Sequence, residues 1–276
     1  MPPARSRAVR IFISVALAAL LAASSGASAA QDPAVSIWYR GTPAGIPQQS
    51  ELGAIRALGF QSITWPGAHK AGLADVHRLA GIVGLKVRVA DRPVPLSAMT
   101  AFNPPRHVDI VIGMSTSTIV TPLAWSAIAH GAREIAFDGG VKTGAGLLNE
   151  KDGSLRPWAL AAQSLARQLS ANSNLLDELQ AGPALMTPGK PQARDAAGMD
   201  VTLLDAGRAW VLIATNSSAV KATRSIAFPK YVPYALWVSW IGGPSLAMLS
   251  EPQGPRWVAT LAPRSAQVYI IDKKDQ

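Results

Sequence analysis

Between residues 35 and 179, short runs rich in β-branched and aromatic residues alternate with longer stretches whose apolar positions recur at helical spacing. Glycine directly follows two of the predicted helices, at Gly59 and Gly84, where it supplies the left-handed conformation that ends a helix. Strands that alternate with helices form parallel sheets covered by helices, so the pattern predicts an α/β domain. The predicted strands are 35–39, 60–65, 85–90, 108–113 and 134–138, and the predicted helices are 48–58, 73–83, 122–130 and 157–173.

The pattern changes after Gly182-Pro183, where the helical spacing disappears. Short apolar runs separated by Gly, Pro, Asn and Ser turns are typical of an antiparallel β-sandwich or barrel. The sequence therefore predicts an α/β domain over residues 31–182 and an all-β sandwich domain over residues 183–276. The strands predicted in the second domain are 201–205, 209–215, 224–228, 234–240, 256–261 and 266–272.

The first thirty residues have the organisation of a secretory signal peptide. Arginines at 5, 7 and 10 precede the apolar run 11–23, and the small residues 27–30 offer a cleavage site before Gln31. The run is too short to span a bilayer stably, and no later segment is apolar enough to do so. A retained N-terminal anchor is the alternative. We therefore expect an exported protein, periplasmic or secreted.

Charge and cysteine content narrow the range of partners. The chain of 276 residues has 26 Lys+Arg, 17 Asp+Glu and no cysteine, so disulfides and a lipid-anchored cysteine are excluded. Loss of residues 1–30 removes three of the cations and leaves a net charge of +6. The remaining cations are scattered rather than clustered, which argues against a nucleic-acid partner.

Four segments carry a resemblance to a known family. Residues 37–66 resemble the first βαβ unit of glycoside hydrolases with a (β/α)-barrel, particularly the β-galactosidase-like members. Residues 125–139 resemble their penultimate helix and last barrel strand, and residues 146–176 resemble their closing loop and last helix. Residues 262–272 look like the last strand of their β-sandwich tail. The resemblance implies an ancestral sugar-cleaving barrel followed by a sandwich, and a carbohydrate as the partner.

The sequence departs from this family in length. A complete barrel has eight βα units and at least about 200 residues, whereas residues 35–179 provide room for the five strands counted above. Matching the ends to the family implies that the first three and last two strands are present, with the Pro-rich segment 92–106 in place of the middle ones. The family's acid/base glutamate follows the missing fourth strand. Its nucleophile position, after the predicted strand 108–113, is followed by Met114-Ser115-Thr116, with no carboxylate.

Functional side chains of parallel α/β folds gather at the carboxyl ends of the strands. Asp91 and Asp138 are the two carboxylates at such positions and are the candidate catalytic acid and base, with an ion pair or a turn as the alternative. Trp65, Tyr39 and Arg40 are the candidate substrate-binding residues. An aromatic ring such as that of Trp65 can stack on a sugar, although packing in the core is the alternative for any tryptophan.

Other chemistry is not indicated. Glu150 follows the only Asn-Glu pair but lies in turn-forming sequence, and His130 is expected to cap a helix before Gly131. The histidines lack metal-ligand spacing and the glycines of 139–146 lack the order of a nucleotide-binding loop, so no metal or cofactor is expected. Three functions remain open: a glycosidase, a non-catalytic polysaccharide-binding or envelope protein, and an interaction module. Because the shortened sheet has open edges, a homodimer is a further hypothesis.

Overall fold

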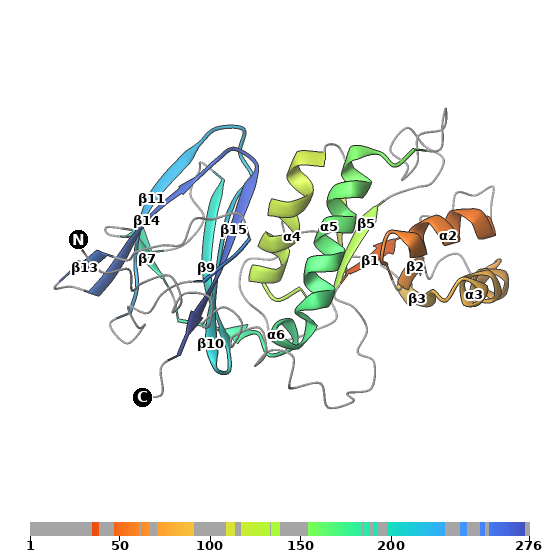
Figure 1. Cartoon of the computed structure of the whole chain (residues 1–276), viewed down its shortest axis with the longest axis horizontal. Coiled ribbons are helices and arrows are strands. Elements are labelled where there is room, and N and C mark those ends of the chain that lie inside the picture. The colour runs from red at the N-terminus through yellow and green to blue at the C-terminus, as the bar shows by residue number, and fades with distance from the viewer. Residues whose placement is uncertain are drawn as a thin grey trace, which may run out of the picture. The chain divides into compact units, whose positions relative to one another are not determined.

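The α/β region is built on a parallel sheet of five strands in the order β3-β2-β1-β5-β4 (Figure 1). In this order the first strand of the region pairs with the last, and β4 lies at the edge opposite β3. All five strands were predicted from the apolar runs, and the structure confirms them within two residues. They are β1 (Val35–Trp38), β2 (Ser62–Pro66), β3 (Lys86–Ala90), β4 (Asp109–Gly113) and β5 (Glu134–Asp138).

This computed structural model describes fourteen stretches of the chain. They are residues 35–38, 47–60, 62–66, 71–90, 109–113, 117–132, 134–138, 154–183, 185–187, 190–191, 198–229, 238–241, 249–251 and 254–273. Residues 33–276 belong to one compact unit. The predicted signal peptide, residues 1–30, lies outside the described residues.

The helices follow the predicted pattern. Gly59 and Gly84 have φ of +91° and +74°, which confirms that left-handed glycines end the first two helices. Pro157 starts the long helix at a position where its missing N–H is not needed. The helices are α2 (Gln49–Ala57), α3 (Leu73–Ile82), α4 (Val120–Ala129), α5 (Pro157–Ala171) and α6 (Ser173–Asp177), with a 3₁₀ turn η2 (Ser117–Ile119) before α4.

The C-terminal region contains two antiparallel sheets of five strands, as expected of a sandwich. Their orders are β12-β15-β10-β9-β6 and β13-β14-β11-β7-β8. Strand β6 precedes Pro183 and therefore lies before the predicted start of the sandwich domain. Strand β13 and the two-residue strands β6, β7 and β8 were not predicted. The strands are β6 (Gln180–Ala181), β7 (Met186–Thr187), β8 (Lys190–Pro191), β9 (Met199–Ala206), β10 (Ala209–Asn216), β11 (Ala222–Ala227), β12 (Val238–Ile241), β13 (Leu249–Glu251), β14 (Gly254–Leu261) and β15 (Ser265–Asp272).

Helix α4 joins the two regions. It packs against α5 and β4 on one side and against β9, β10 and β15 on the other (Figure 1). Its apolar residues share a core cluster with Leu204, Val211, Ile213 and Val268 of the sandwich. A second cluster fills the space between the two antiparallel sheets. Because α4 is apolar on nearly every face, the α/β region depends on the sandwich to keep this helix out of water.

Candidate functional site at the carboxyl edge of the parallel sheet

All five strands of the parallel sheet end at the same edge, because they run in the same direction. Their last residues are Trp38, Pro66, Ala90, Gly113 and Asp138. The central strand at this edge is β1, with β2 and β5 on its two sides. The chain therefore leaves Trp38 and Asp138 side by side, in the middle of the edge where α/β proteins form their sites.

The register of the sheet sorts its positions into rows. Asp138 is the register partner of both Trp38 and Gly113, and the same row continues through Thr64 to Arg88. Successive rows belong to opposite faces of a sheet. The preceding row consists only of Val and Ile residues and Phe137; of these, Ile63 and Phe137 are fully buried and Val87 is half-buried. The row of Asp138, with Thr64 and Arg88, therefore belongs to the face opposite this apolar row.

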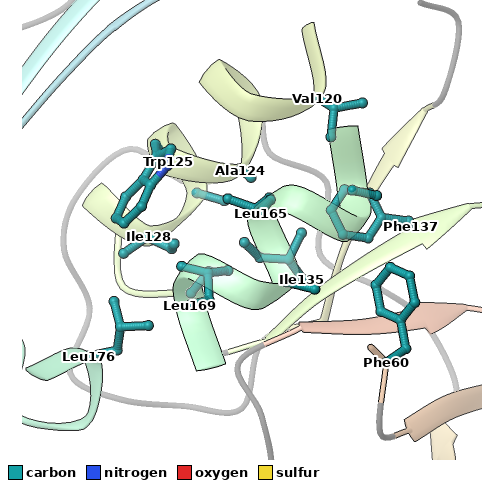
Figure 2. Close-up of a cluster of buried hydrophobic side chains, with 14 of the residues drawn as sticks. Phe60, Val120, Ala124, Trp125, Ile128, Ile135, Phe137, Leu165, Leu169 and Leu176 are labelled. Atoms are coloured by element: carbon teal, nitrogen blue, oxygen red, sulfur yellow. The ribbon is translucent and has the colours of Figure 1, made fainter. Parts of the chain in front are cut away.

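Packing under β5 fixes the backbone that carries Asp138. Phe137 meets Phe60 edge to face, with ring centroids 6.2 Å apart and an interplanar angle of 66°. Figure 2 shows Phe137 and Ile135 beside Leu165 of α5 and Val120 of α4. A strand with two buried side chains in a close-packed core holds its backbone rigidly. This part of the predicted site thus rests on a firm scaffold.

Asp91, the proposed partner of Asp138, lies outside the described residues, but the end of its strand is placed. Ala90 ends β3, and two strands, β2 and β1, separate β3 from β5. Strands in a sheet are about 4.8 Å apart, so β3 and β5 are separated by about 14 Å measured along the sheet. The pairing of Asp91 with Asp138 stays a prediction.

The three predicted substrate-binding residues differ in whether the structure describes them. Tyr39 and Arg40 lie outside the described residues, directly after Trp38. Trp65 is described, and its side chain is only 3% exposed within the main core cluster. The structure therefore places Trp65 among the packing side chains. Stacking of its ring on a sugar would require that cover to move.

Asp200 is a buried carboxylate on β9 that contacts α4, and it was not among the predicted site residues. The Asp200 Oδ2 atom accepts a hydrogen bond from Ser126 Oγ at 3.3 Å and lies 3.6 Å from His130 Nε2. His130 ends α4 as predicted, and its Nδ1 lies 2.7 Å from the backbone oxygen of Ser126. Although the residue types are those of a Ser-His-Asp triad, the serine contacts the aspartate and not the imidazole. This arrangement joins two elements and activates no nucleophile.

The other titratable groups of the described residues form no further site. Burial in the sandwich core raises the pKa of Tyr269 to about 12, and its hydroxyl donates to Gln267 Oε1 at 3.0 Å. Within the described stretches, His, Asp and Glu residues form no group of three that could hold a metal ion. None of the helices in those stretches has the length and apolarity needed to cross a membrane.

Several of the solved structures that are similar to this chain are those of glycoside hydrolases. No family model matches the sequence, and no curated protein matches it. Among similar solved structures is a family 30 endoxylanase from Clostridium papyrosolvens C71, with 9% identity and a TM-score of 0.38, over 86% of this chain and 65% of that one. Another is an α-amylase from Geobacillus thermoleovorans complexed with acarbose, with 11% identity and a TM-score of 0.40, over 82% of this chain and 63% of that one.

A third similar structure is a family 27 β-L-arabinopyranosidase from Geobacillus stearothermophilus in complex with arabinose. It has 11% identity and a TM-score of 0.37, over 81% of this chain and 61% of that one. The chain spans less than two thirds of the length of each of these three structures.

Proposed function

We propose that this chain is an exported, glycoside-hydrolase-like protein that binds a carbohydrate at the carboxyl edge of a shortened (β/α)-barrel. The pairing of β1 with β5 is the observation that carries the proposal. In doubly wound sheets the chain passes from the first three strands to a fourth that pairs with the first. Here β4 lies outside β5, so the first and last strands of the region pair, as they do in a closed barrel.

The shortening follows from the same strand order. In a complete barrel, further βα units would connect the strand at one edge of this sheet with the strand at the other. The edges are β3 and β4, and residues 91–108 connect them in sequence. We propose that the barrel's middle strands are missing between β3 and β4. The lost fourth strand is the one that carries the acid/base glutamate in the family that the sequence resembles.

Binding without cleavage is the function that the strand order favours. Glycosidases hold two carboxyl groups about 5–5.5 Å apart when they retain configuration, and about 6.5–9.5 Å apart when they invert it. Among the described strand ends at this edge Asp138 is the only carboxylate, and the strand that carries its counterpart in the resembling family is one that we propose is missing. In this proposal Asp138 accepts hydrogen bonds from sugar hydroxyls, and Tyr39 and Arg40 contact the same ligand from the end of β1.

Cleavage of a glycosidic bond by Asp138 and Asp91 is the second candidate function. It is favoured by the position of Asp138 at the carboxyl edge, beside the central strand β1. The third candidate is a structural or protein-interaction module, in which the edge strands β3 and β4 pair with a second copy. A homodimer that completes the barrel would be visible as twice the monomer mass in light scattering. A monomer at the highest attainable concentration would refute it.

Binding and cleavage are separated by measuring both on the wild type and on substitutions of three aspartates. Binding to a panel of polysaccharides is measured by affinity electrophoresis and calorimetry, and cleavage is measured with aryl-glycosides. Asp138→Asn should weaken carbohydrate binding about tenfold, because a charged acceptor is lost. Asp75→Asn on α3, where the carboxylate is exposed and pairs with Arg78, is the matched control and should change nothing. Turnover by the wild type that Asp138→Asn or Asp91→Asn abolishes would favour the glycosidase instead.

Export is tested on the secreted or periplasmic protein itself. N-terminal sequencing should begin at Gln31 if the signal peptide is cleaved where the small residues predict. A chain that retains Arg5 to Arg10 and remains with the membrane fraction would establish the anchor instead.

A further inference from the structure

The short connection between β14 and β15, which lie in different sheets of the sandwich, contains a backbone conformation that its sequence does not favour. Arg264 has φ of +51° and is the only non-glycine residue with positive φ among the described residues. A side chain in this left-handed region costs about 1 kcal/mol or more, and glycine or asparagine usually takes such positions. A strained residue is kept only where its surroundings or its function require it. The conformation therefore raises the question of what the Arg264 side chain does.

Arg264 is held at both its backbone and its side chain. Its N–H donates to the Ser218 carbonyl at 3.0 Å, and its Nη1 donates to Thr118 Oγ1 at 3.2 Å. Thr118 lies in η2, in the segment that follows the carboxyl end of β4. The connection between β14 and β15 thus brings a guanidinium group to the carboxyl edge of the parallel sheet. Gly113, which ends β4, is in turn the register partner of Asp138.

The guanidinium of Arg264 has capacity for a ligand. A guanidinium presents five N–H donors in a planar fork that matches a carboxylate. Both Arg264 and Thr118 are exposed, and no described carboxylate lies within ion-pair distance of Arg264. The bond to Thr118 orients the group, which reduces the conformational entropy that binding would cost. The chain without its signal peptide also has a net charge of +6, which attracts anions over a longer range.

We propose that Arg264 binds the carboxylate of an acidic polysaccharide at the carboxyl edge, and that the sandwich thereby supplies one side of the binding site. The proposal rests on the proposed carbohydrate-binding function and makes its ligand a uronate-containing polymer. A bidentate pair between a guanidinium and a carboxylate gives both affinity and orientation. Thr118 is a positioning residue in this arrangement, because it acts through Arg264.

The test compares two turn arginines at opposite ends of the paired strands β10 and β15. Arg264 precedes Ser265, the partner of Asn216, whereas Arg208 precedes Ala209, the partner of Asp272. Arg208 is also exposed in a tight turn, so Arg208→Gly removes the same charge far from η2. The whole chain and the variants Arg264→Gly, Arg264→Lys, Thr118→Val and Arg208→Gly are titrated with polygalacturonate, dextran sulfate and neutral xylan.

Arg264→Gly should weaken polygalacturonate binding about tenfold or more, because a charge-assisted hydrogen-bond pair is lost. Its melting temperature should stay the same or rise, because glycine relieves the left-handed strain. Arg208→Gly should bind within about twofold of the wild type, and Arg264→Lys and Thr118→Val should lie between the two. A preference for dextran sulfate over polygalacturonate would overturn the uronate assignment.

The two proposals fail in different ways. Equal losses in Arg264→Gly and Arg208→Gly would mean that only net charge matters, and would overturn the role of Arg264. Strong binding to xylan that Arg264→Gly leaves unchanged would do the same while the carbohydrate-binding function stands. A wild type that binds none of the three polymers would overturn both.

Discussion

The two antiparallel sheets pack around a core of their own, whereas the parallel sheet shares its core with one of them. The sandwich has a cluster of its own between its two sheets, with Trp257 and Tyr269 packed edge to face at 5.7 Å. The parallel sheet has no such independence, since its main cluster continues through α4 into the sandwich sheet. The sandwich sheet β12-β15-β10-β9-β6 is therefore covered on both faces, by α4 on one side and by β11 and β14 on the other.

This difference shows how a shortened α/β region can remain folded. Helices of a complete barrel face the strands on one side and water on the other, so they are amphipathic. Helix α4 has eight buried residues among its ten, and one of them is Trp125. A helix of that composition is stable only between two layers. The sandwich is then a structural part of the α/β region and not a detachable module.

Replacing Trp125 should have the largest effect. Its side chain is fully buried between α4 and the sandwich, so Trp125→Ala should lower the free energy of unfolding by about 3–5 kcal/mol. Leu160→Ala on α5, where the side chain is 50% exposed, is the control and should cost less than about 1 kcal/mol. Urea unfolding followed by circular dichroism should show one transition for each protein. Two separate transitions in the wild type would show that the regions are independent.

The buried cluster of Asp200 is the next largest contribution to this junction. Asp200→Asn keeps the volume but removes the charge that Ser126 Oγ and His130 Nε2 approach, and should cost about 2–3 kcal/mol. Asp205→Asn is the control, because its carboxylate is a third exposed where it meets Lys273. Adding His130→Gln to Asp200→Asn should cost less than the sum of the single changes. Strict additivity in denaturant titrations would mean that the two side chains are not coupled.

Two glycine-to-alanine variants compare a crowded position at the connection between the regions with an open position on α3. A Cβ at Gly182 would overlap the backbone carbonyl of Leu203, so Gly182→Ala should destabilise by about 1–3 kcal/mol. A Cβ at Gly81 on α3 meets nothing within 4 Å, so Gly81→Ala should stabilise by about 0.5–1 kcal/mol. Thermal unfolding of both variants measures the difference. A Gly182→Ala protein as stable as the wild type would show that β6 can move away from β9.

Local signals in the sequence were sufficient for the long helices and for all five strands of the parallel sheet, but not for α6, β13 or the two-residue strands. Gly59 and Gly84 ended their helices as predicted, because the left-handed conformation is a local property. The run Val211–Ala214 is apolar at every position because β10 lies in a sheet that is covered on both faces. Its continuity was a sign of double cover that the alternating pattern of an ordinary sandwich strand lacks.

Contacts between distant segments were not predictable in the same way. Asp200 reads as an ordinary polar residue at the start of a strand, and its partner Ser126 is 74 residues away. Arg264 reads as a turn residue, and neither its positive φ nor its bond to Thr118 follows from local propensity. At the predicted site, strand ends could be read from the sequence, but the strand order that separates β3 from β5 could not.

The smallest effect expected here is confined to alkaline pH and reports on the sandwich alone. Burial raises the pKa of Tyr269 from 10.0 to about 12, so the folded state holds the phenolic proton more tightly than the unfolded state does. The stability that this provides is complete below pH 10 and is lost as the pH rises from 10 to about 12. Tyr269→Phe should therefore flatten the fall of unfolding free energy across that window, while costing about 1 kcal/mol or less at neutral pH through the lost bond to Gln267.

Because the parallel sheet shares a core with the sandwich, a helical signal followed in the same urea titrations should show the same flattening. An unchanged slope in the variant would assign the alkaline sensitivity to other groups, and a helical signal that does not follow it would separate the two regions.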